Sequence, residues 1–98
     1  MTDTKRKMNS KIKNQLFIVG GATSGFGKAV AVALLNEGAK VIAVARGEKK
    51  LKALTKKYGK QVETIAADIT QSETITTIMS TIGKRKISGA LINAGGPP

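Results

Sequence analysis

The apolar residues of this chain gather in four short runs with polar or helix-patterned stretches between them. The runs occupy residues 16–19, 41–45, 62–67 and 90–92. The first two are continuous and rich in Val and Ile, which is typical of strands buried on both faces of a parallel sheet. The pattern therefore predicts four strands over these ranges.

The apolar spacing becomes helical in the three intervening segments. Residues 28–37 form a strongly apolar segment that ends at Gly38. Residues 48–58 place Leu51, Leu54 and Tyr58 on one face, and residues 72–82 carry an apolar stripe at i, i+3, i+4 and i+7. We expect Ser72 to cap the third helix, because a serine hydroxyl can accept from the free N–H groups of a first turn.

The resulting order, βαβαβαβ, predicts an α/β fold. Short connections through helices imply parallel strands joined by right-handed crossovers, with helices on both faces of the sheet. The expected architecture is a Rossmann-like parallel sheet of order 3-2-1-4, which is half of a doubly wound domain. Residues 1–14 are polar and lack apolar periodicity, so we expect a disordered basic leader there and a partial domain over residues 15–98, ending after strand four.

A glycine-rich turn, Gly21-Ala22-Thr23-Ser24-Gly25-Phe26-Gly27, lies between the first strand and the first helix. Glycine permits a tight turn and lets backbone N–H groups approach an anion without an intervening Cβ. The helix that follows adds its positive end, and the hydroxyls of Thr23 and Ser24 are further donors. The pattern favours a nucleotide phosphate site over a purely structural turn. A P-loop is not indicated, because Ala29 stands where the hydroxyl residue after Lys28 is needed.

Arg46 ends the second strand, the position that distinguishes two dinucleotides. An acidic residue there would bind a free ribose diol, whereas a cation accepts a 2′-phosphate. Lys49 and Lys50 follow closely. The sequence thus favours NADP (NADPH) over NAD, the alternative being that Arg46 is a solvated residue at a helix start.

Composition narrows the chemistry further. The chain has 98 residues, neither Cys nor His, and a formal charge of +11, so thiolate or imidazole metal sites and Ser-His or Cys-His catalysis are excluded. The apolar run at residues 16–19 is too short for a signal or a membrane span, so we expect a cytoplasmic protein. The charge itself is compatible with a phosphorylated ligand or nucleic acid.

These residues resemble the short-chain dehydrogenase/reductase family. The turn at 21–27 is similar to its Thr-Gly-x-x-x-Gly-x-Gly motif, with Gly20 in place of the Thr, and Arg46 stands where NADP-preferring members carry a basic residue. Asp68, followed by Ile69, resembles the Asp that hydrogen-bonds near the adenine ring. Asn93-Ala94-Gly95 resembles the end of the Asn-Asn-Ala-Gly motif, with Ile92 in place of the first Asn. The resemblance implies that these positions bind the cofactor: Gly21, Thr23, Ser24, Gly25, Phe26, Gly27, Arg46, Asp68, Ile69, Asn93, Ala94 and Gly95.

The resemblance also implies a catalytic set that this chain does not show. The family transfers hydride between nicotinamide and a carbonyl or alcohol with a Tyr, a Lys four residues later and an upstream Ser. The single tyrosine, Tyr58, is followed four residues on by Val62 and lies on an apolar helix face. We therefore expect Tyr58 in the core and no catalytic residues here.

Three hypotheses remain open. The chain is the cofactor-binding half of an NADP-dependent reductase (a fragment or truncated product), inactive alone. Alternatively, it is a non-catalytic nucleotide-binding module that acts with a complementing chain or as a homo-oligomer through the exposed edge of strand four. The third hypothesis, a basic nucleic-acid-binding protein, explains the charge but neither the glycine turn nor Asp68 and Asn93.

Overall fold

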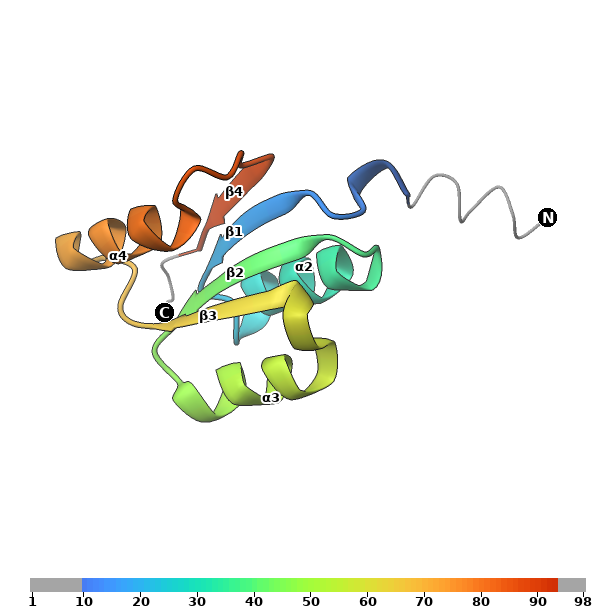
Figure 1. Ribbon diagram of the computed structural model, residues 1–98. Coiled ribbons are helices and arrows are strands. Elements are labelled where there is room, and N and C mark those ends of the chain that lie inside the picture. Colours follow the sequence, from blue (N-terminus) through green and yellow to red (C-terminus); the bar gives the residue numbers. More distant parts are fainter. Residues whose placement is uncertain (1–9, 94–98) are drawn as a thin grey trace.

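The computed structural model describes residues 10–93, which form a four-stranded parallel sheet with helices on both faces (Figure 1). The strands are β1 (Leu16–Gly20), β2 (Lys40–Ala45), β3 (Val62–Ala66) and β4 (Gly89–Ile92). Their order is β3-β2-β1-β4, and all three neighbouring pairs are parallel. The predicted Rossmann-like sheet and its strand order are confirmed.

Three helices alternate with the strands: α2 (Gly25–Asn36), α3 (Glu48–Tyr58) and α4 (Ser72–Ile82). Short 3-10 turns, η1 (Ser10–Ile12) and η2 (Gly59–Gln61), precede β1 and β3. Each helix lies within a few residues of its predicted range, although α2 begins three residues earlier, inside the glycine turn.

The expected cap at Ser72 is wrong. Gln71 occupies the N-cap position, Ser72 is the first residue of α4, and no side chain caps this end. The chain instead secures α4 through Thr74, whose hydroxyl donates to the carbonyl oxygen of Asp68 at 2.6 Å and whose N–H donates to that of Gln71 at 3.0 Å.

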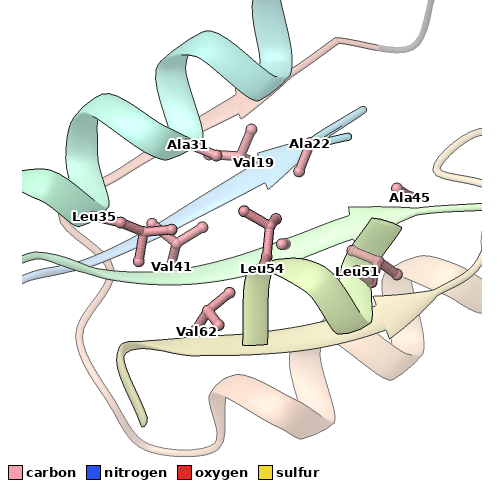
Figure 2. Packing of buried hydrophobic residues seen from close by; sticks show 10 residues of the cluster. Val19, Ala22, Ala31, Leu35, Val41, Ala45, Leu51, Leu54 and Val62 are labelled. Atoms are coloured by element: carbon pink, nitrogen blue, oxygen red, sulfur yellow. The ribbon is translucent and has the colours of Figure 1, made fainter. Parts of the chain in front are cut away.

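The sheet separates two apolar clusters. Side chains alternate along β2, so that Val41, Ala43 and Ala45 meet α2 and α3 in one cluster (Figure 2), while Ile42 and Val44 meet α4 in the other. The first cluster also includes Leu35 of α2 and Leu54 of α3, and Ile78 and Ile82 of α4 belong to the second. The second strand is thus buried on both faces, as its continuous apolar run predicts.

Of the expected leader, residues 10–14 fall within the described part of the chain. Residues 1–9 lie outside the described residues, but η1 and the residues after it join the fold. The N–H of Asn14 donates to the carbonyl oxygen of Gly38 at 2.9 Å, and that of Lys40 donates to Gln15 at 2.8 Å. Residues 10–14, which their polar and aperiodic sequence assigned to the leader, therefore contain η1 and a backbone hydrogen bond to Gly38.

Strand β4 lies at the edge of the sheet, with β1 as its partner among residues 10–93. Leu91 turns toward the cluster of α2 and α3, whereas Ile92 is 54% exposed. No helix in the described part of the chain is long and apolar enough to cross a membrane.

Candidate dinucleotide-binding site

Main-chain hydrogen bonds hold the glycine turn against two neighbouring strand ends. The N–H groups of Gly21 and Ala22 both donate to the carbonyl oxygen of Val44 in β2, at 2.8 and 3.2 Å. On the other side, the N–H of Asn93 donates to the carbonyl oxygen of Gly20 at 3.1 Å. The turn therefore starts from a fixed position at the carboxyl edge of the sheet, where ligands bind in open α/β folds.

Two glycines of the turn are required by close approaches. Gly21 has φ of +72°, and a Cβ there would overlap the carbonyl oxygen of Asn93. A Cβ on Gly27 would overlap the carbonyl oxygen of Gly21 and lie 3.3 Å from Nδ2 of Asn93. The turn, the start of α2 and the end of β4 are thus packed backbone to backbone, which only glycine allows.

Gly20 has a third role, at the position where the family motif carries Thr. A Cβ at residue 20 would lie 3.1 Å from Cγ1 of Ile69. Ile69 follows β3 and packs with the cluster under α4. The glycine in place of Thr therefore accommodates the side chain of Ile69 at the floor of the site.

The amino end of α2 begins beside the site, directly after Ser24. Ser24 holds the N-cap position with extended backbone (φ −147°, ψ 151°), and its hydroxyl makes no capping hydrogen bond to the helix. The first turn of α2 contains no acidic residue. Because the first N–H groups of a helix lack intrahelical acceptors, this end favours an anion.

Asp68 is held in place by its own loop. Its Oδ1 accepts from the N–H and from the hydroxyl of Thr70, at 2.9 and 2.7 Å. These two hydrogen bonds, the hydroxyl one first, keep the pKa of the Asp68 carboxyl below its ordinary value, and the positive charge of Arg46 acts in the same direction. Asp68 is therefore a fixed, ionised acceptor at the end of β3.

The strand ends and their loops enclose one open cavity of about 730 Å³. The glycine turn borders it on one side, the loop from β2 into α3 on another, and the loop after β3 on a third. Its lining consists of Gly21, Thr23, Ser24, Val44, Ala45, Arg46, Gly47, Glu48, Lys49, Lys50, Ala67, Asp68, Ile69, Thr70 and Asn93. A volume of this size falls in the range of ligand pockets.

The cavity gathers seven of the residues expected to bind a cofactor: Gly21, Thr23, Ser24, Arg46, Asp68, Ile69 and Asn93. Three other expected residues lie in the glycine turn but do not line the cavity. Gly27 is buried under the turn, Gly25 has open space around it, and Phe26 is 66% exposed. Ala94 and Gly95 lie outside the described residues.

Several lining residues were not among the expected set. Lys49 and Lys50 follow Arg46 in the first turn of α3, and their position just beyond a strand end was the available signal. Thr70 could have been found from its spacing to Asp68, since Asp and a hydroxyl residue two positions later commonly form such a turn. The backbone of Gly47 gave no signal of its own.

Tyr58 is not at this cavity. Its ring packs against the cluster of α2 and α3, and its hydroxyl donates to Oδ1 of Asn36 at 2.8 Å. The residue is half-buried rather than a full member of the core as predicted, because the hydroxyl remains at the surface. No group of three or more acidic, His or Cys residues gathers to hold a metal within residues 10–93.

A parallel sheet of order β3-β2-β1-β4, with a glycine turn and a cavity at its carboxyl edge, defines a Rossmann-like dinucleotide-binding unit. The model of the short chain dehydrogenase family matches residues 15–97. The chain therefore belongs to the short-chain dehydrogenase/reductase family, whose members bind a nicotinamide dinucleotide.

Individual relatives agree with this assignment. The chain is 38% identical over 81 residues to an uncharacterized oxidoreductase, YxnA, of Bacillus subtilis, covering 80% of this chain and 22% of that protein. It is 38% identical over 80 residues to serine 3-dehydrogenase of Rhizobium radiobacter, covering 80% and 32%. The crystal structure of L-sorbose reductase from Gluconobacter frateurii, complexed with NADPH and L-sorbose, superposes with a TM-score of 0.77 at 26% identity, covering 89% of this chain and 35% of that one. The chain thus spans about a fifth to a third of its relatives' length.

Proposed function

We propose that this chain forms the NADP-binding portion of an oxidoreductase that transfers hydride to or from a carbonyl or alcohol. The observation that carries the proposal is the cavity in which Arg46 and the glycine turn face the same space. Amides at the start of α2 and the hydroxyls of Thr23 and Ser24 would hold the pyrophosphate. Asp68 and Ile69 would border the adenine.

The preference for NADP over NAD rests on the charges at the end of β2. Arg46, Lys49 and Lys50 line the cavity together, opposed there by Glu48 and Asp68. Asp68 keeps its negative charge, because its hydrogen bonds from Thr70 favour the ionised form, and the three cations still outnumber the two carboxylates of the lining. An exposed guanidinium can bind a 2′-phosphate through two N–H groups at once. The bound NADPH in the L-sorbose reductase crystal supports the same cofactor class.

Hydride transfer would need groups that this chain does not bring to the cavity. The only tyrosine in the sequence, Tyr58, is hydrogen-bonded to Asn36 away from the site. The cofactor would supply the hydride, and the residues here would bind and orient it. We propose that the 98-residue chain binds NADPH but does not by itself catalyse hydride transfer to or from a substrate.

We also propose that this protein is located in the cytoplasm. The apolar run that follows the basic N-terminus is β1, which lies between β2 and β4 in the sheet. The place of this run as an inner strand of the sheet accounts for its apolar residues.

The test is a fluorescence titration of NADPH and NADH against the wild type, Arg46→Ala and Arg46→Asp. Loss of a bidentate phosphate contact predicts at least tenfold weaker NADPH binding by Arg46→Ala, with NADH binding little changed. Arg46→Asp repels the 2′-phosphate and can accept from a ribose diol, so it reverses the preference. The matched control is Lys52→Ala, which removes a neighbouring cation that does not line the cavity. Equal NADPH affinity of the wild type and Arg46→Ala would refute the assignment of Arg46, and failure of the wild type to bind either dinucleotide would refute the proposed function.

A further inference from the structure

A second cavity, of about 250 Å³, lies between α2 and α3. One flank of α3 lines it, because residues three and four positions apart lie on the same side of a helix. The lining residues on this flank are Lys50, Ala53, Leu54 and Lys57. Lys28 and Val32, four residues apart on α2, line the cavity from the other helix. We name this space the interhelix cavity.

Part of the interhelix cavity has an apolar surface. Leu54 is buried in the core cluster of α2 and α3, and Val32 packs against that cluster. The ring of Tyr58 packs there too, and its hydroxyl donates to Oδ1 of Asn36 at 2.8 Å, so the ring is held as a fixed wall. Ala53 is exposed, and its single methyl group leaves open the space that a larger side chain would fill. Such a surface favours an apolar group that leaves water.

Three cations surround this apolar surface. The side chains of Lys28, Lys50 and Lys57 all line the cavity and are exposed. Nζ of Lys57 lies 5.5 Å from the centroid of the Tyr58 ring, and the attraction between them keeps this charge beside the ring wall. No Asp or Glu within residues 10–93 lines the cavity. The unopposed charges favour an anion.

From these observations we propose that the interhelix cavity binds a small phosphate monoester whose organic part is apolar. The organic part lies against Leu54 and the ring of Tyr58, and the phosphate faces the lysines. A phosphate monoester carries about 1.5 to 2 negative charges at neutral pH, so it matches three cations better than a carboxylate does. Lysine binds phosphate as a point charge and needs no fixed orientation.

The volume of the interhelix cavity limits the size of this ligand. About 250 Å³ equals the liquid volume of about eight water molecules, and it lies below the range of about 300–1,000 Å³ found for drug-sized ligands. A dinucleotide is therefore too large for the interhelix cavity, whereas a single ring or a short alkyl chain with one phosphate fits.

The interhelix cavity is a separate site from the cofactor cavity. The two meet at Thr23 and Lys50, which line both. Arg46 lines the cofactor cavity alone, whereas Lys28 and Lys57 line the interhelix cavity alone. The inference therefore goes beyond the proposed function and does not depend on it, and substitutions at the unshared residues can test each site by itself.

The experiment is a calorimetric titration of the 98-residue chain with phenyl phosphate, accompanied by methyl NMR spectra. We expect saturable binding and shifts of the methyl resonances of Val32 and Leu54. The double variant Lys28→Met/Lys57→Met keeps two unbranched side chains but removes two charges, which predicts about tenfold weaker binding. Absence of binding by the wild type, or unchanged binding by this variant, overturns the proposal.

A second variant tests the shape of the cavity without changing its charge. Ala53→Leu fills the space between the helices and should also weaken phenyl phosphate binding about tenfold. Ala33→Leu, at an exposed position of α2 outside the lining, should leave it unchanged, as should the charge control Lys52→Met/Lys56→Met. Circular dichroism of each variant checks that the fold is kept. Equal effects of a variant and its control overturn the proposal.

Two further ligands test the two halves of the proposed recognition. Inorganic phosphate lacks the apolar part, and phenylacetate carries a carboxylate in place of the phosphate. Each should bind about tenfold more weakly than phenyl phosphate. Equal binding of inorganic phosphate would show attraction by lysine charge alone, and equal binding of phenylacetate would show that the phosphate is not selected. Either result overturns the proposal.

Arg46→Ala distinguishes the interhelix cavity from the cofactor cavity as the place where phenyl phosphate binds. Its binding should be unchanged in this variant, because Arg46 does not line the interhelix cavity. Loss of binding in Arg46→Ala, with Lys28→Met/Lys57→Met unaffected, would place the phosphate in the cofactor cavity and overturn the proposal. A wild type that binds phenyl phosphate at Val32 and Leu54 but binds no NADPH supports the interhelix site and refutes the proposed cofactor.

Discussion

The carbonyl oxygen of Asn93 occupies the space that a side chain on Gly21 would need. The two residues are far apart in sequence, one after β1 and the other after β4. The N–H of Asn93 also donates to Gly20, so the end of β4 contacts the turn through both its N–H and its carbonyl group. Two neighbouring parallel strands are thus fixed relative to each other at the edge where the cofactor is proposed to bind.

This contact predicts a graded series of Gly→Ala variants. Gly21→Ala meets both a positive φ of +72° and the overlap with Asn93, and we expect a loss of about 3 kcal/mol in the free energy of unfolding. Gly59→Ala has the positive φ (+60°) with open space around it, and should cost about 1 kcal/mol. Urea denaturation followed by circular dichroism measures each value.

Gly47 is the matched control of this series. It has open space and no positive φ, at the N-cap position of α3. Gly47→Ala should stay within about 0.5 kcal/mol of the wild type. A Gly21→Ala variant as stable as Gly47→Ala would show that the close approach to Asn93 does not exist.

The Thr74 hydroxyl links α4 to the loop after β3, which lines the cavity. Its side chain is 3% exposed, and its hydroxyl donates to the carbonyl oxygen of Asp68 at 2.6 Å. Thr74→Val keeps the shape but leaves that oxygen without this donor, and we expect a loss of about 1–2 kcal/mol in unfolding free energy. Weaker NADPH binding should accompany it, because Asp68 and Ile69 move with the loop.

Thr77→Val provides the control for Thr74. The Thr77 hydroxyl also donates to a backbone carbonyl, that of Glu73 at 3.2 Å, but it lies on the exposed side of α4. This change should alter stability by less than about 0.5 kcal/mol and leave NADPH binding unchanged. Equal effects of the two substitutions would contradict the role given to Thr74.

The strands of this fold could be predicted from the sequence because burial on both faces leaves a continuous apolar run. Residues 41–45 are the clearest case, with every side chain of that run buried. The helix starts were harder to predict, because the hydrogen bonds that fix them are not apparent from residue type at the cap position. At α4 the sequence offered Ser72 as a cap, yet the bond that secures this end comes from Thr74 to a residue six positions earlier, Asp68.

The lining of the candidate cavity could be predicted where one residue type has a distinct physical task. A glycine run after a strand and a cation after the next strand both met this condition, and Arg46 and Gly21 line the cavity. Lining by the backbone alone gives no such signal. Gly47 reaches the cavity through the path of the loop from β2 into α3, which depends on how α3 packs.

The Arg85–Glu63 pair predicts a pH-dependent part of the stability. Nη1 and Nη2 of Arg85 lie 2.6 and 2.9 Å from the two carboxylate oxygens of Glu63. The hydrogen bonds from Arg85, more than its charge, place the pKa of Glu63 below its ordinary value of 4.5, so the folded state binds this proton less readily than the unfolded chain. The contribution is complete above the unfolded pKa and is lost as the pH falls through the folded one.

Glu63→Gln should therefore cost about 0.5–1 kcal/mol at pH 7, since the pair is at the surface. The difference from the wild type shrinks as the pH falls below 4.5, the ordinary pKa of the carboxyl. Urea denaturation at a series of pH values, repeated in 1 M salt, measures it. Lys84→Gln removes a neighbouring cation and serves as control. A difference that is constant with pH would contradict the low pKa of Glu63.

Substitution of Tyr58 should change the stability of the fold without changing NADPH binding. Its hydroxyl joins α3 to α2 by donating to Asn36 at 2.8 Å, while its ring packs against the core cluster. Tyr58→Phe keeps the ring and should lose about 0.5–1 kcal/mol of unfolding free energy, and Asn36→Ala should lose a similar amount. The double variant should lose little more than either single one, because both remove the same bond. NADPH binding should not change in any of the three, since neither residue lines the cavity. A Tyr58→Phe variant that keeps full stability but weakens NADPH binding would instead assign the phenol to the cofactor site.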